Sequence, residues 1–112
     1  MAWLLYEGQV VASVESYRSV KPKLLRSCHK KLRDVKGVLL IKDSFFVHNF
    51  MASDAVDVVL LDKDFLVLKN VMLGKNRILF IPKNTKYILL ASTKTLANYR
   101  IDRGDLLKIA GD

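Results

Sequence analysis

Two short apolar runs in the middle of the chain, close together, restrict its fold more than any other feature. Residues 55–61 are apolar except for Asp57, and residues 65–68 form a second run beyond a polar corner bounded by Asp62 and Asp64. The runs are rich in Val and Leu and too close for a pair of helices, so they indicate strand, tight turn, strand. The two aspartates that flank the turn are expected to cap it. The sequence therefore predicts a central β-hairpin.

Further short strands are expected on both sides of this hairpin, each bounded by turn-forming residues. Residues 70–76 show no clear period and are expected to form a loop or an irregular edge. The other strands are expected at residues 3–6, 10–14, 38–41, 45–47, 77–81, 87–91 and 106–109. A chain of 112 residues forms one domain, here residues 1–112. The predicted fold class is mainly β (α+β by content), as a compact antiparallel β-sandwich or partly closed barrel.

One amphipathic helix is expected at about residues 22–34, and a short helical turn at about residues 93–99. Pro22 suits the first turn of the longer helix, and Gly37 ends it. An arc of about 100° on its surface is apolar, the width of a core-facing stripe; it contains Leu24, Leu25, Cys28, Leu32 and Val35. The opposite arc is a basic patch, made of Lys23, Arg26, Lys30 and Arg33.

The net charge of +8 is unevenly distributed along the chain. Residues 1–36 and 73–112 each carry +5, whereas residues 37–72 carry −2. Basic excess is typical of proteins that bind nucleic acid or anionic surfaces, and the basic patch would supply phosphate contacts. A lysine-rich solvated exterior explains the same charge and is the favoured interpretation, because no nucleic-acid motif and no aromatic platform accompanies the patch.

Asp57 is the most informative single residue, because a strand does not bury a lone carboxylate without donors. Backbone N–H groups, a hydroxyl or His48 would serve, and the favoured role is structural. His48, Asp54 and Asp57 together form a set that is able to bind a divalent cation, although their spacing matches no known metal signature. Cys28 is the only cysteine, so a disulfide within the chain is excluded and a buried, inert thiol is favoured.

No catalytic motif, metal site or cofactor-binding loop is recognised in the sequence. The apolar runs are far shorter than the ~20 residues that a membrane-spanning helix needs. The first ten residues lack the basic start and the long apolar core of a secretory signal, so a cytoplasmic location is expected.

From Val47 through Asp64 the chain resembles the domain of unknown function 192 family. The similarity lies in Val47-His48-x-Phe50, then Asp57-Val-Val and an aspartate-bounded turn, and Gly104-Asp105 matches the Gly-Asp near the family's end. The resemblance covers about residues 9–110 and implies a compact β-sandwich-like domain of unknown activity. Many relatives are exported or associated with the cell envelope.

The chain departs from the family pattern at two places. Residues 51–55 replace a Gly-Met-Arg segment and a proline. Phe65 replaces a glycine that usually follows the second aspartate of the turn, which would cost on the order of 1 kcal/mol if the position requires a positive φ.

Three functions remain open, and an enzyme is not favoured among them. The first is a non-catalytic binding or accessory module for a protein or small ligand, with a site at His48, Asn49, Asp54 and Asp57. The alternative is weak binding of nucleic acid or an anionic surface through the basic patch. The third is a hydrolase or metal-dependent enzyme centred on His48 and Asp57.

Overall fold

The structure, a computed structural model, describes residues 2–17, 37–42, 46–48, 55–74, 77–93, 95–96 and 99–111. These residues contain nine strands and no helix. The strands are β1 (Ala2–Tyr6), β2 (Gln9–Tyr17), β3 (Val38–Lys42), β4 (Phe46–His48), β5 (Val56–Leu61), β6 (Val67–Leu73), β7 (Ile78–Phe80), β8 (Tyr87–Ser92) and β9 (Lys108–Gly111). The predicted mainly β class is confirmed.

Seven strands form one sheet in the order β6-β5-β8-β3-β2-β1-β9, and β4 pairs with β7 in a separate two-stranded ribbon. Every neighbouring pair is antiparallel except β2 and β3, which are parallel. The sheet is therefore mixed, and the expected all-antiparallel arrangement is wrong. A parallel pair needs a crossover connection, and the helix predicted at residues 22–34 falls within it, outside the described residues.

The central hairpin is confirmed, with β5 and β6 paired in antiparallel register from Val56–Leu73 to Leu61–Val67. The second strand continues to Leu73, so of the loop or irregular edge expected at residues 70–76, the loop is wrong for residues 70–73, which lie in an edge strand. The physical reason is that β6 is an edge strand of the sheet. An edge strand has a neighbour on one side only, so some of its side chains remain in water. Lys69 and Asn70 are exposed there, although they interrupt the apolar pattern of the strand.

Both faces of the large sheet carry a hydrophobic core. One core joins Leu4, Leu40, Leu61 and Leu89 to Leu96, Ile101 and Leu107, so the segment before β9 covers that face. The other joins Leu39, Ile41, Val58, Leu60 and Leu90, and the partly buried Leu79 and Ile81 pack against it. Burial on both faces explains the continuous apolar run in β5, where residues 58–61 are almost completely inaccessible to water.

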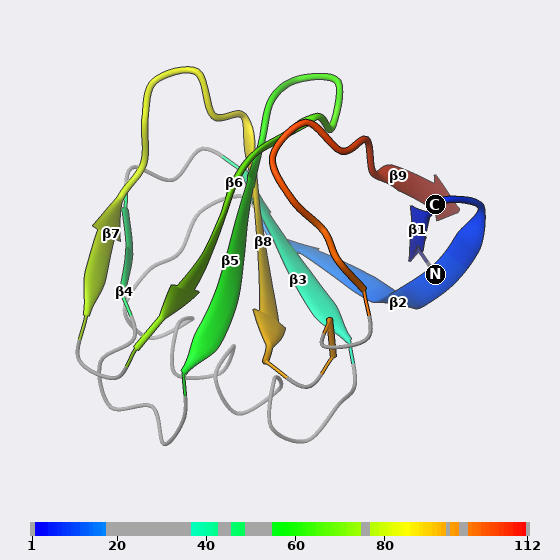
Figure 1. The fold of residues 1–112 in the computed structure, drawn as a ribbon, viewed down its shortest axis with the longest axis horizontal. Helices are drawn as coiled ribbons and strands as arrows, with labels where there is room; N and C mark the ends of the chain where they lie inside the picture. The colour runs from blue at the N-terminus through cyan, green and yellow to red at the C-terminus, as the bar shows by residue number, and fades with distance from the viewer. Residues whose placement is uncertain are drawn as a thin grey trace.

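The sheet is strongly curved but not closed into a barrel (Figure 1). Residues 104–107 nevertheless bond to the start of β6: the N–H of Val67 donates to the carbonyl of Asp105 at 2.8 Å, and the N–H of Leu107 donates to that of Phe65 at 3.0 Å. Leu106, expected to open the last strand, forms only an isolated bridge with Leu66, and β9 begins at Lys108. The two edge strands, β6 and β9, are thus linked at one end without pairing.

In the part of residues 93–99 that the structure describes, tight turns are found in place of the expected helical turn. The N–H of Thr95 donates to the carbonyl of Ser92 at 3.0 Å, and the N–H of Tyr99 donates to that of Leu96 at 3.0 Å. Both bonds span three residues, and no helix is assigned to residues 93, 95–96 or 99. Among the described residues, no helix has the length and apolar character needed to cross a membrane.

Candidate functional site

Asp57 lies near the start of β5, on the sheet face that carries the first core. Its register partners are Met72 on β6 and Ala91 on β8. Ala91 is fully buried, whereas Met72 is 67% exposed at the edge of the sheet. Asp57 is therefore half-buried between the core and the solvent, and this burial raises the pKa of its carboxyl group.

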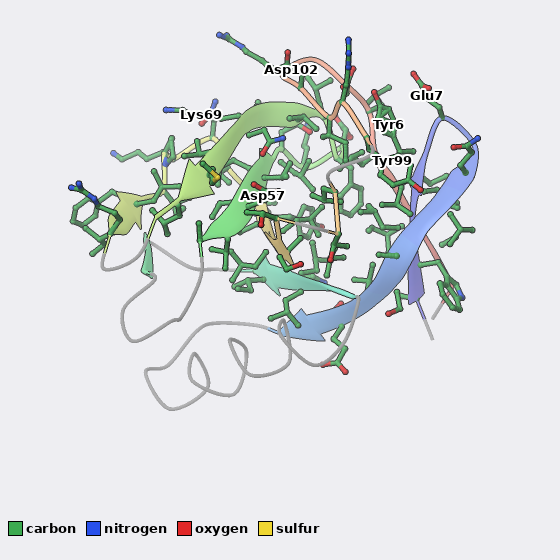
Figure 2. All side chains as sticks on the ribbon, turned by 60° about the horizontal axis from the view of Figure 1, so that its bottom comes forward. Tyr6, Glu7, Asp57, Lys69, Tyr99 and Asp102 are labelled. Atoms are coloured by element: carbon green, nitrogen blue, oxygen red, sulfur yellow. The ribbon has the colours of Figure 1, made fainter. Side chains whose placement is uncertain are left out.

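The donors expected around Asp57 are not found in the described part of the chain, where no hydrogen bond or ion pair to its carboxylate is present. The position at the rim of the sheet gives the physical reason. Because the neighbouring edge strand is exposed, water is able to solvate a carboxylate at this position without protein donors. Figure 2 shows Asp57 on β5, away from the other labelled acidic residues.

His48 is the last residue of β4, where it pairs in register with Ile78 of β7. His48 and Asp57 therefore belong to different sheets. Asn49 and Asp54 lie outside the described residues, as does the basic patch of Lys23, Arg26, Lys30 and Arg33. In the described ranges, no three His, Cys, Asp or Glu residues lie in a group that could hold a metal ion.

The β4–β7 ribbon carries a feature that the sequence did not reveal. Ile78 is 44% exposed and Phe80 is 73% exposed, whereas Leu79 between them packs against the second core. Alternation along a strand places Ile78 and Phe80 on the same side, away from the core. The sequence of β7 is continuously apolar and predicts an ordinary strand. Its pairing with β4, outside the large sheet, and the exposure of Ile78 and Phe80 show that one side faces water.

The hairpin corner is built by Asp62 and Phe65. The carboxylate Oδ1 of Asp62 accepts hydrogen bonds from the N–H groups of Asp64 at 2.8 Å and Leu66 at 3.0 Å, so Asp62 caps the turn as expected. Asp64 is exposed. Phe65 has a φ of 62°, which is the backbone conformation that a glycine would favour.

Aromatic packing holds Phe65 in this conformation. Its ring stacks on Tyr87 with centroids 4.6 Å apart and an angle of 18° between the planes. The Nζ of Lys42 lies 5.6 Å from the centroid of the same tyrosine. These contacts attach the hairpin corner to β8 and β3, so its role is to stabilise the fold.

A second polar cluster joins the two ends of the chain. The hydroxyl of Tyr6 donates to Oδ2 of Asp105 at 3.1 Å and lies 3.2 Å from the carbonyl of Arg100, and the N–H of Asp102 donates to the same Oδ2 at 2.8 Å. Desolvation raises the pKa of Tyr6, and the hydrogen bond to Asp105 and the nearby carboxylates of Asp105, Glu7 and Asp102 raise it further.

The labelled members of this cluster lie on the same side of the molecule in Figure 2. The signal in the sequence was Gly104-Asp105, which the family resemblance singled out without giving it a role. Gly104 has a φ of 93°, and this turn directs Asp105 to its partners.

Most of the positive charge belongs to two stretches of the chain. Residues 18–36, in the connection between β2 and β3, contain eight basic residues and one acidic residue. Residues 65–101, which include β6, β7 and β8, contain seven basic residues and no acidic residue. Each stretch therefore carries +7, and the rest of the chain carries −6.

No family model, no curated protein and no solved structure matches this chain. The resemblance to the domain of unknown function 192 family therefore stays a prediction.

Proposed function

We propose that this chain is a small non-catalytic binding module, and that its recognition surface lies on the β4–β7 ribbon around His48. The observation that carries this proposal is the exposure of Ile78 and Phe80 on a strand whose other side is anchored in the core. When a partner covers a large apolar side chain that was exposed to water, the complex is stabilised by roughly 25 cal/mol for each Å² of apolar surface that is buried.

Two further points support the ribbon as the recognition surface. His48, the histidine singled out in the sequence, is the register partner of the exposed Ile78. In addition, Leu79 and Ile81 pack on the core, which fixes the backbone that presents Ile78 and Phe80. Asn49 and Asp54 follow β4 along the chain but lie outside the described residues, and Asp57 lies on the large sheet, so the proposal does not depend on these three residues.

Nuclear magnetic resonance with the isotope-labelled chain tests this proposal. The chain is titrated with short oligonucleotides, an acidic peptide and a panel of small metabolites, and amide shifts are followed. We expect a binding ligand to shift residues 46–48 and 77–83, and Phe80→Ser to remove the response. Leu106→Ser is the matched control, because Leu106 is 65% exposed and lies elsewhere. Shifts confined to other surfaces would overturn the proposal.

The alternative function is the binding of nucleic acid or an anionic surface through Lys23, Arg26, Lys30 and Arg33. The excess of seven positive charges in residues 18–36 favours it. Retention on heparin in about 0.3 M salt that is lost when these four residues are changed to glutamine would support it. Elution at low salt would exclude it.

A further inference from the structure

We infer that the ligand of the β4–β7 ribbon is single-stranded nucleic acid, with Phe80 stacking on a base and Arg77 and Lys83 contacting phosphates. This inference rests on the proposed function, since it names the ligand class of the same surface. Two properties of the described residues carry it: an exposed aromatic ring and the basic residues beside it.

The exposed ring is Phe80, the most exposed of the large apolar side chains in the described part of the chain. Nucleic-acid bases stack on aromatic side chains, and this contact tolerates every sequence because each base has an aromatic face. Ile78 lies on the same side of β7, about 7 Å along the strand from Phe80. The two side chains thus offer a stacking surface and a second apolar contact in line.

The charge around the ring suits a polyanion. Arg77 precedes Ile78 and Lys83 follows Phe80 closely, and both residues are exposed. They belong to the stretch of residues 65–101, which has seven basic residues and no acidic one. The acidic residues nearest to β4 along the chain, Asp43 and Asp54, lie outside the described residues.

Two other exposed apolar side chains, Leu106 and Val10, have acidic residues close to them along the chain. Leu106 directly follows Asp105, which accepts hydrogen bonds in the acidic cluster with Asp102, and Val10 lies close to Glu7 along the chain. That cluster belongs to the end of the molecule with β1 and β9, whereas β4 and β7 lie at the opposite end (Figure 1). The carboxylates of this cluster therefore lie far from β7.

The exposed ring also favours a single strand over a duplex. A duplex hides the faces of its bases, so it would contact only Arg77 and Lys83 and would bind more weakly. We therefore expect little sequence preference and a clear preference for unpaired strands.

Fluorescence anisotropy with the full chain tests the inference. The probes are labelled twelve-nucleotide oligo-U and oligo-dT, a duplex of the same length, and a poly-glutamate peptide. Phe80→Ala is expected to weaken oligo-U binding roughly 5- to 150-fold, as loss of one stacked base predicts. Phe80→Tyr should restore binding to within about twofold because it keeps the ring. Leu106→Ala is the control and should leave binding unchanged.

The salt dependence supplies a second readout. Arg77→Gln combined with Lys83→Gln should reduce the slope of log affinity against log salt by about 1.4, or about 0.7 for each lost phosphate contact on a single strand. Equal affinity for duplex and single strand, or no binding of oligo-U at low salt, would overturn the inference.

The remaining outcomes separate this inference from the proposed function. If Phe80→Ala removes binding of poly-glutamate while oligo-U never binds, the ribbon is the recognition surface and its ligand is not nucleic acid. If oligo-U binds but depends only on Lys23, Arg26, Lys30 and Arg33, the nucleic-acid site lies there and the inference is wrong. If no probe shifts ribbon resonances, both proposals fail.

Discussion

Asp57 shows how the position of one residue in a sheet changes the chemistry expected of it. A carboxylate within an apolar run was expected to be held by donors, yet none is present in the part of the chain that the structure describes. Burial without donors disfavours the charged form, so the folded protein binds a proton at Asp57 more tightly than the unfolded chain does. The ionised side chain therefore destabilises the fold at neutral pH.

We predict that Asp57→Asn raises the melting temperature at pH 7 by a few degrees at most. The sign follows from linkage: the folded pKa lies above the ordinary value of 3.8, so the charge costs stability at every pH above the folded pKa. As the pH falls through the folded pKa towards that ordinary value, the wild-type carboxylate is neutralised and the advantage of Asn shrinks. Thermal melts between pH 4 and pH 8 measure this. A lower melting temperature for Asn at pH 7 would instead reveal a donor bound to the carboxylate.

The hairpin between β5 and β6 shows what an element requires at its corner. The sequence left open whether position 65 requires a positive φ, and the structure gives Phe65 a φ of 62°. The backbone conformation of Phe65 costs about 1 kcal/mol. Its ring stacks on Tyr87, which contributes about 0.5–1.5 kcal/mol in addition to the burial of the ring, and this offsets the backbone cost. The strained residue is retained because it joins the hairpin to β8.

We predict that Phe65→Ala destabilises the protein more than Phe65→Gly does. Both changes lose the stacked ring, but alanine keeps the strained φ, whereas glycine adopts it freely. The expected losses are about 2–4 kcal/mol for alanine and about 1 kcal/mol less for glycine. Urea unfolding measures both, and the same pair of changes in a Tyr87→Ala background should cost less, since the ring has lost its partner. Equal losses for alanine and glycine would show that the corner is not strained.

Strands and turns marked by short-range sequence patterns are predictable, whereas the pairing of strands that are distant in sequence is not. The hairpin and the cap at Asp62 follow from short-range patterns that the structure confirms. The parallel pairing of β2 with β3 joins residues separated by a long connection, and no local period encodes it. The sequence predicts too short a strand β6, because an edge strand tolerates the polar residues Lys69 and Asn70, which interrupt the apolar pattern.

The same limit applies to the candidate site. Asp57 was correctly placed in a buried strand, but its solvent access depends on Met72, a residue of the neighbouring strand. Exposure of Phe80 likewise depends on the pairing of β7 with β4 outside the large sheet. Both properties arise from tertiary contacts, so composition and periodicity alone do not contain them.

At the scale of the whole molecule, the two ends of the chain are tied together. Strand β1 lies between β2 and β9, and the hydroxyl of Tyr6 binds Asp105 just before β9. Asp105 also accepts the N–H of Asp102, and its own carbonyl accepts from Val67 at the start of β6. One turn therefore connects the first strand, the last strand and the edge of the central hairpin, which holds the curved sheet together without closure.

We predict that Tyr6→Phe lowers the melting temperature by a few degrees and that Asp105→Ala lowers it further, because Asp105 also holds Asp102. The double variant should be no less stable than Asp105→Ala alone, since the hydroxyl has then lost its charged acceptor.

The folded pKa of Tyr6 lies above 10.0, so the stability due to its neutral hydroxyl is present below pH 10 and is lost as the pH rises through the folded value. The gap between wild type and Tyr6→Phe should therefore narrow at high pH. Tyr99→Phe, which keeps a ring 6.4 Å from that of Tyr6, is the control and should melt like the wild type. Additive losses from Tyr6→Phe and Asp105→Ala would mean that the two residues act separately and that the turn does not join the ends of the chain through this bond.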